Sequence, residues 1–224
     1  MERVTEPELM DEADQARAYS EADFSDSHQA VVTNFTERFP DFAALAGARV
    51  IDLACGPADV TTRLARGFPG ATFFGVDGAE AMIALGRERV ARDGLAERIT
   101  LECRFMPDPT LRELGPFDAA VCTGALHHFH DPMALWSTFR DVAGAGTRVF
   151  IQDLTRPDSP STAQALVDRY AAGEPEVLRR DYYQSLLAAF TLDEIHDQLH
   201  TIGWDHFAVE AVSDRHVVVS GIVR

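Results

Sequence analysis

Short apolar runs alternate with amphipathic stretches through the middle of the chain. Apolar, β-rich runs predict strands over residues 49–53, 72–76, 99–103, 117–123 and 147–154. Helical spacing of apolar positions predicts helices over residues 59–66, 79–93 and 132–143. Because strands and helices alternate at short intervals, we expect a mostly parallel sheet that is covered by helices on both faces.

The pattern before residue 47 differs from the rest and predicts two helices within residues 8–46. Apolar residues of the second helix recur at helical spacing, and Ser25 or Ser27 is expected to be its N-cap. Gly47 follows the last of these apolar positions. We therefore expect an N-terminal helical lid over residues 1–46 and an α/β domain over residues 47–224.

The regular alternation stops after residue 154. Two polar helical stretches, predicted within residues 157–190, form a helical cap insertion. Thr191 and Glu194 then have the spacing of a capping box and open a helix that Gly203 closes. Two β-rich runs, 207–212 and 216–223, predict an antiparallel pair. The expected fold is a doubly wound, mostly parallel, seven-stranded sheet with a reversed C-terminal β-hairpin.

Charge narrows the range of partners. The net charge is −16, and the chain contains no lysine. Proteins that bind nucleic acid neutralise phosphates with a basic face, so nucleic acid and anionic membranes are poor partners and a small molecule is favoured. No apolar run approaches the roughly 20 residues of a membrane span. The three cysteines lack C-x-x-C spacing, and we expect buried free thiols and a cytoplasmic protein.

The first strand-to-helix turn carries the most informative chemistry. Asp52 ends an apolar run and is followed by small residues, of which only Gly56 is a glycine within the turn. This departs from the dinucleotide fingerprint G-x-G-x-x-G. The carboxylate would repel a phosphate, so the turn favours a nucleoside without one. Asp77 follows one βα unit later, at the separation typical of a carboxylate that binds ribose hydroxyls.

Four segments together resemble the class I S-adenosylmethionine-dependent methyltransferases, from about residue 50 to the C-terminus. Residues 50–58 resemble the glycine-rich first motif, with Ala54 and Ala58 where glycine is more usual. Residues 75–82 (GVDGAEAM) resemble the second-strand motif. Residues 117–122 with 126–132 resemble the fourth strand and its loop, and the final hairpin resembles the family's reversed last strand.

The resemblance implies S-adenosyl-L-methionine as cofactor, with Asp77 on the ribose, Asp52 near the methionine part and Gly124 near the sulfonium. Residues 17–24 resemble a lid-like helix that carries Tyr19. Two residues are candidates for the contact with adenine. Counting from the end of the third strand gives Phe105, whereas aligning Met106-Pro107 with the family's usual Leu-Pro gives Glu102. The expected cofactor contacts are Tyr19, Asp52, Ala54, Gly56, Asp77, Gly78, Met82, Arg104, Phe105, Thr123 and Gly124.

The histidines 127, 128 and 130 allow three interpretations: a metal site, a general base, or ordering of the loop. Their spacing gives no facing pair on a helix and no carboxylate cluster accompanies them, so no metal site is expected. If one histidine acts as a base, His128 is the expected residue. Asp131 is expected to cap the next helix. The expected substrate-side residues are His127, Tyr170, Tyr182 and Tyr183.

The function implied by the resemblance is methyl transfer from S-adenosylmethionine to a small-molecule O-, N- or C-nucleophile, by in-line displacement. An RNA or protein methyltransferase is the second interpretation, disfavoured by the acidic charge. A non-methylating protein that binds S-adenosylmethionine is the third, because a fold does not fix a function.

Overall fold

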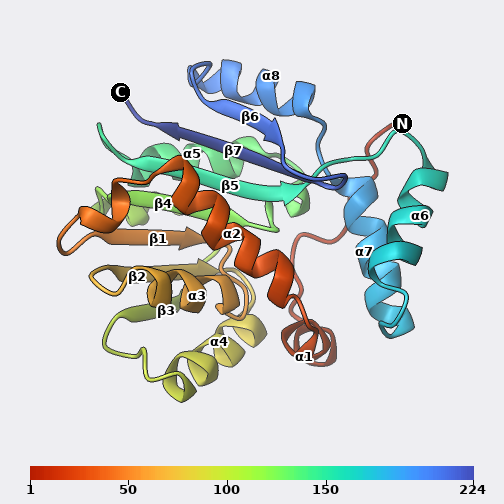
Figure 1. Ribbon diagram of the computed structural model, residues 1–224, viewed down its shortest axis with the longest axis horizontal. Helices are drawn as coiled ribbons and strands as arrows, with labels where there is room; N and C mark the ends of the chain where they lie inside the picture. The colour runs from red at the N-terminus through yellow and green to blue at the C-terminus, as the bar shows by residue number, and fades with distance from the viewer.

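Seven strands form one mixed sheet in the computed structural model, which describes residues 1–224. The strand order is β3-β2-β1-β4-β5-β7-β6 (Figure 1). The first five strands in this order are mutually parallel, and β7 runs antiparallel to both β5 and β6. The strand bounds are β1 Arg49–Leu53, β2 Thr72–Asp77, β3 Ile99–Cys103, β4 Ala119–Thr123, β5 Arg148–Leu154, β6 Ala208–Ala211 and β7 His216–Ile222. The predicted doubly wound sheet with a reversed hairpin is confirmed.

The direction of winding reverses at β1. Val50 of this strand pairs with Phe73 of β2 on one side and with Ala119 of β4 on the other. The two connections therefore leave the sheet toward opposite faces and open a crevice at the carboxyl ends of the strands. Ligands of open α/β sheets bind at such a switch point.

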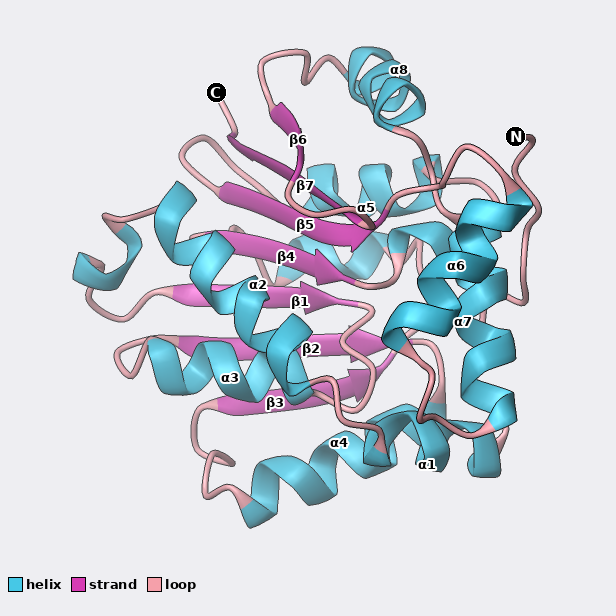
Figure 2. Ribbon diagram, turned by 45° about the vertical axis from the view of Figure 1, so that its right-hand side comes forward, coloured by secondary structure: helices cyan, strands magenta, loops and turns pink.

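Helices cover both faces of the sheet (Figure 2). One face packs against α2 (Ser25–Arg38), α3 (Asp59–Gly67) and α4 (Glu80–Arg92), and the other against α5 (Met133–Val142) and α8 (Leu192–Ile202). Val50 contributes to the first core and Ile51 to the second, because successive strand residues point to opposite faces.

Three further segments lie at the carboxyl edge of the sheet. Helices α6 (Pro160–Tyr170) and α7 (Glu176–Ala188) pack on each other through a small apolar cluster beyond the strand ends (Figures 1 and 2). Helix α1 (Ala13–Glu21) packs on α4 through Ala16 and Met82. Short 3₁₀ turns complete the chain: η1 Phe42–Ala44, η2 Pro109–Glu113 and η3 Leu126–His128.

Several local predictions can be compared with the structure. The capping box of α8 is confirmed: Thr191 and Glu194 each accept a backbone N–H from the other residue, and Gly203 ends the helix with φ +77°. The predicted N-cap of α2 is wrong. Helix α2 begins at Ser25 itself, whose N–H donates to Asp23 Oδ1 at 3.0 Å, and the Ser27 hydroxyl donates to the Phe24 carbonyl.

Other predictions needed adjustment at their boundaries. Strand β4 begins two residues later than predicted, because the Phe117 N–H donates to the Val142 carbonyl at the end of α5.

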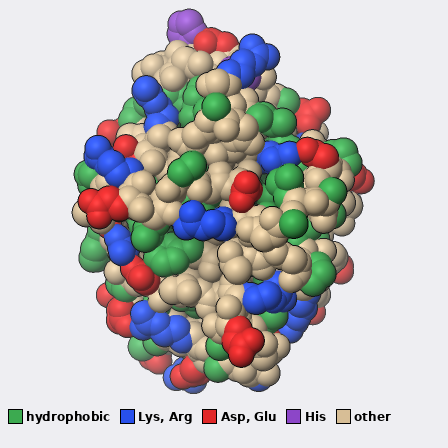
Figure 3. Space-filling view, turned by 90° about the vertical axis from the view of Figure 1, so that its left-hand side faces the viewer, with side chains coloured by type: hydrophobic (Ala, Val, Ile, Leu, Met, Phe, Trp, Pro, Cys, Tyr) green, Lys and Arg blue, Asp and Glu red, His purple; other side chains and the backbone are tan.

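All three cysteines are free, but Cys103 is only half-buried. None of the helices is both long and apolar enough to cross a membrane. The face in Figure 3 shows acidic and basic side chains interspersed, without a continuous basic stripe.

Candidate active site

The turn after β1 has three residues in the left-handed backbone region. Ala54, Gly56 and Ala58 have φ of 58°, 52° and 57°. For alanine this conformation costs roughly 1–2 kcal/mol, because Cβ crowds the following carbonyl. The turn folds back onto β2, where the Cys55 N–H donates to the Val76 carbonyl at 2.9 Å. The small side chains leave its backbone open to the carboxyl-edge crevice.

Asp77 ends β2 and holds the turn in place. Its Oδ2 accepts from the Gly56 N–H at 2.8 Å, and its Oδ1 accepts from the Ala79 N–H at 2.9 Å. Burial raises the pKa of this carboxyl, although both backbone hydrogen bonds favour the ionised form. Since each carboxylate oxygen can accept a second hydrogen bond, the side chain can still bind two hydroxyl groups.

Asp52 lies beneath the turn rather than on the cavity wall. Its Oδ2 accepts from the Thr61 hydroxyl at 2.6 Å, whereas Oδ1 is buried and has no hydrogen-bond partner. Burial raises the pKa of this carboxyl to about 7. A buried acceptor without a hydrogen bond destabilises the fold. A donor from a ligand or a water that reaches it removes this cost.

A cavity of about 1320 Å³ extends from the turn to the cap. Small-molecule pockets usually measure about 300–1,000 Å³, so this one has room for a nucleoside and a second molecule. Of the residues predicted for the site, thirteen line it: Tyr19, Ala54, Gly56, Asp77, Gly78, Met82, Phe105, Thr123, Gly124, His127, His128, Tyr170 and Tyr182.

Three predicted site residues do not line the cavity: Asp52, Arg104 and Tyr183. Arg104 is held by acidic neighbours, since it donates to Glu102 Oε2 at 2.7 Å and to Asp108 Oδ2 at 3.1 Å. Tyr183 packs on the apolar cluster between α6 and α7.

The two candidates for adenine recognition are separated by the structure. Glu102 is paired with Arg104 and is not part of the cavity wall. Phe105 lines the cavity and is 65% exposed. A Cβ placed on Gly78 would lie 3.3 Å from the Phe105 ring, so this glycine leaves room beside the ring. The geometry therefore favours Phe105 as a flat apolar wall over Glu102 as a hydrogen-bonding partner.

At the other end of the cavity, His127 is fixed by Asp153 at the end of β5. Its Nδ1 lies 2.5 Å from Asp153 Oδ1, and its backbone N–H donates to Asp153 Oδ2 at 3.0 Å. Burial opposes the charge on His127, but the negative Asp153 raises its pKa. The pair holds one ring orientation, with Nε2 facing away from Asp153.

His128 lies beside His127, with ring centroids 4.3 Å apart. Burial lowers the pKa of His128 to about 3. This makes the ring neutral at pH 7 but a weak proton acceptor, so its predicted role as a base stays a prediction that the environment does not favour. Asp131 Oδ1 accepts from the Met133 N–H at 2.9 Å, at the start of α5, as predicted for a capping residue.

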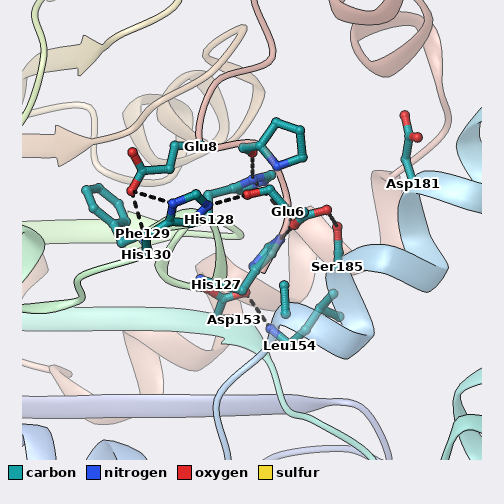
Figure 4. Close-up of polar contacts among 12 residues, drawn as sticks. Glu6, Glu8, His127, His128, Phe129, His130, Asp153, Leu154, Asp181 and Ser185 are labelled. Atoms are coloured by element: carbon teal, nitrogen blue, oxygen red, sulfur yellow. Dashed lines mark hydrogen bonds and ion pairs between the residues drawn. The ribbon is translucent and has the colours of Figure 1, made fainter. Parts of the chain in front are cut away.

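Glu6 is the residue of this site that the sequence pattern did not reveal. Its Oε1 lies 3.4 Å from His127 Nε2 and 3.4 Å from His128 Nδ1 (Figure 4). Arg3 ties the same N-terminal segment to this region, because its guanidinium donates to the carbonyls of His127, Phe129 and Ala188. Glu6 stands in a coil segment without periodicity, so no sequence signal links it to histidines more than a hundred residues away.

These features define a doubly wound α/β protein with a cavity of about 1320 Å³ at the carboxyl edge of its sheet, where ligands of such folds bind. Residues 50–146 match a family described as a methyltransferase domain. This match covers less than half of the chain, and together with the fold it makes the chain similar to the class I S-adenosylmethionine-dependent methyltransferases.

One curated methyltransferase is similar to about half of this chain. The chain is 34% identical over 117 residues to the ubiquinone/menaquinone biosynthesis C-methyltransferase of Geobacter sulfurreducens; the match covers 50% of this chain and 44% of that protein. The chain thus spans less than half the length of this curated relative.

Solved structures share the fold at low sequence identity. A putative S-adenosyl-L-methionine-dependent methyltransferase of Methanococcus maripaludis has a TM-score of 0.69 at 13% identity, over 99% of this chain and 98% of that one. A plantazolicin methyltransferase in complex with a desmethylPZN analog and SAH has a TM-score of 0.68 at 13% identity, over 94% and 91%.

Proposed function

We propose that this chain transfers the methyl group of S-adenosyl-L-methionine to a small-molecule O-, N- or C-nucleophile by in-line displacement. One observation carries the proposal: a single cavity connects the Asp77 carboxylate to the His127–Asp153 pair. A nucleoside at the first end and an acceptor at the second would share one cavity. Holding two reactants in one space is the main requirement of a displacement reaction.

The residues at the turn fit this cofactor. Asp77 keeps acceptor capacity for two ribose hydroxyls. Only two arginines line the cavity, Arg180 and Arg215, and both belong to the cap side. A phosphate at the turn would face Asp77 without a cation to offset it, whereas a cationic, phosphate-free nucleoside is attracted.

S-Adenosylmethionine supplies an electrophilic methyl group on a sulfonium, which is a good leaving group. The chain then has to orient and enclose the reactants. Gly124 follows β4 with φ +62° and no side chain at the cavity wall, which leaves space between the two ends. Residues 6–10 and parts of α1 and α7 line the cavity and shield part of it from solvent.

The acceptor side suits a small molecule rather than a polymer. Tyr170 and Tyr182 line the cap side of the cavity, and His127 and His128 line the opposite wall. Arg180 donates to Asp181, and the guanidinium carbon of Arg215 lies 3.3 Å from the centre of the Tyr170 ring. The net charge of −16 disfavours RNA. The name of the Geobacter relative, which acts in quinone biosynthesis, supports a small acceptor.

The test is transfer of an isotopically labelled methyl group from S-adenosylmethionine to a panel of phenols, amines, carboxylates, thiols and enolisable ketones. We expect label in the products of at least one class, together with an equal amount of demethylated cofactor. Cofactor binding without transfer to any class would contradict the proposal and favour a non-methylating binding protein. Label in RNA or protein alone would favour the second interpretation.

A further inference from the structure

A carboxylate and two imidazoles converge at the acceptor end of the cavity. We propose that Glu6 Oε1, His127 Nε2 and His128 Nδ1 bind a divalent transition-metal ion, with Zn²⁺ as the best match. These three atoms all lie within 4.8 Å of one another. Figure 4 shows the side chain of Glu6 extending toward both rings from the N-terminal segment.

Two of the three separations between the donor atoms are those of ligands around an ion. Zinc bonds of about 2.0–2.1 Å in a tetrahedron place neighbouring ligand atoms about 3.3–3.4 Å apart. Glu6 Oε1 is 3.4 Å from both imidazole nitrogens. A direct charge-assisted hydrogen bond would close to about 2.7–2.9 Å. A neighbouring hydrogen bond between an imidazole and a carboxylate is much shorter, since His127 Nδ1 lies 2.5 Å from Asp153 Oδ1.

Glu6 Oε1 also lacks any other partner. The Glu6 side chain is only 7% exposed, and this oxygen is buried without a hydrogen bond. The second oxygen, Oε2, accepts from the Ser185 hydroxyl at 3.3 Å. A buried carboxylate oxygen without a hydrogen bond is costly, and a cation between it and the two rings would offset that cost.

The surroundings of His127 are those of a metal ligand. A ligating histidine usually donates its other ring N–H to a carboxylate, which fixes the tautomer and turns the free nitrogen toward the ion. Asp153 occupies this position at Nδ1, so Nε2 is the nitrogen that faces Glu6. Arg3 further links the backbone of residues 127 and 129 to the segment that carries Glu6.

This proposal departs from the expectation, drawn from the histidine spacing, that no metal binds. That expectation depended on the absence of an accompanying carboxylate, which the fold supplies from residue 6. A mixed imidazole and carboxylate donor set suits Zn²⁺, Co²⁺ or Fe²⁺, whereas Mg²⁺ and Ca²⁺ prefer oxygen ligands alone. Three protein ligands leave a position open toward the cavity, where an acceptor oxygen or nitrogen could bind.

The test uses the metal alone, without acceptor or turnover. The purified chain is stripped with a chelator and titrated with Zn²⁺ by calorimetry, and the Co²⁺ form is examined for the visible absorption bands of tetrahedral coordination. We expect one ion per chain. Glu6→Gln and His128→Gln should each lower the affinity at least tenfold, and Asp153→Asn by about 10–100-fold, if it folds.

Two matched variants control for adventitious binding. Glu8→Gln changes a neighbouring carboxylate outside the cluster, and His200→Gln removes an exposed histidine that pairs with Asp205. Both should bind Zn²⁺ like the wild type. The proposal is overturned if the wild type binds no stoichiometric ion, if Glu6→Gln has no effect, or if the control variants lose as much affinity. Such a result leaves methyl transfer untouched, because cofactor affinity is measured separately in the same proteins.

Discussion

At the scale of single residues, the turn after β1 combines an open backbone with conformational strain. Ala54 and Ala58 both have positive φ, a conformation that glycine adopts without strain. The sequence indicated that alanine stands at these positions but not that the backbone is left-handed there. That conformation results from the way the turn is held by Asp77 and Val76, which lie more than seventeen residues away along the chain.

Replacement of Ala54 should reveal this strain. Ala54→Gly is expected to raise the free energy of unfolding by about 0.5–1 kcal/mol, because relief of the strained φ exceeds the entropy that glycine adds to the unfolded chain. Ala54→Val should lower it by about 2 kcal/mol or more. The matched control is Ala165→Gly on the exposed face of α6, where the same change should cost about 1 kcal/mol. Urea unfolding measures all three, and destabilisation by Ala54→Gly would contradict the strain.

Asp52 predicts a dependence of stability on pH. Its folded pKa of about 7 lies above the value of 3.8 for a free aspartate, so the folded chain binds the proton more tightly. The stability that this proton confers is present at acidic pH and is lost as the pH rises through 7. Asp52→Asn, which keeps an acceptor for Thr61, should therefore gain stability relative to the wild type between pH 5 and pH 8.

The expected size of this gain is at most about 3 kcal/mol, at about 1.4 kcal/mol for each of the two pH units between pH 5 and the folded pKa of about 7. It is measured as the difference in the free energy of unfolding between variant and wild type at the two pH values, without ligand. An equal pH dependence for both proteins would show that Asp52 is ionised throughout.

At the scale of elements, the sequence predicted most strands and helices because their signals are local. The alternation of apolar positions and the capping box lie within a few residues of each other. Predictions were less accurate where an element's boundary depends on a distant group, as for β4, which starts where α5 ends. Within the expected N-terminal lid, α1 lines the cavity, whereas α2 lines it with its first turns and packs into the core with Val31 and Phe35.

Phe35 makes α2 part of that core. Its ring contacts four other rings, with centroids between 5.1 and 5.6 Å apart: Phe39, Phe42, Phe68 and Phe150. Phe35→Ala should lower the free energy of unfolding by about 3–5 kcal/mol, since it leaves a cavity among buried rings. Phe105→Ala, at an exposed ring, should change it by about 0.5 kcal/mol or less. If the two variants had the same free energy of unfolding in urea, the packing of α2 into the core of the sheet would be contradicted.

At the scale of the whole molecule, the fold brings together groups that no local pattern connects. Gly56 and Asp77 could be predicted to lie together, because they belong to one βα unit and the next strand, and both line the cavity. The acceptor end could not be predicted in full. Glu6, His127 and Asp153 come from an N-terminal coil, a 3₁₀ turn and the end of β5, and only the folded chain places them in contact.

The central claim is that a phosphate-free nucleoside, S-adenosylmethionine, binds at the carboxyl end of β2. Calorimetry with S-adenosylmethionine and its demethylated product tests it most directly. The wild type should bind both, and Asp77→Ala should weaken each by at least tenfold, about 1.4 kcal/mol. Asp205→Ala, which removes a carboxylate outside the cavity, should leave both affinities unchanged. No binding at millimolar concentration, or an unchanged affinity in Asp77→Ala, would contradict the account.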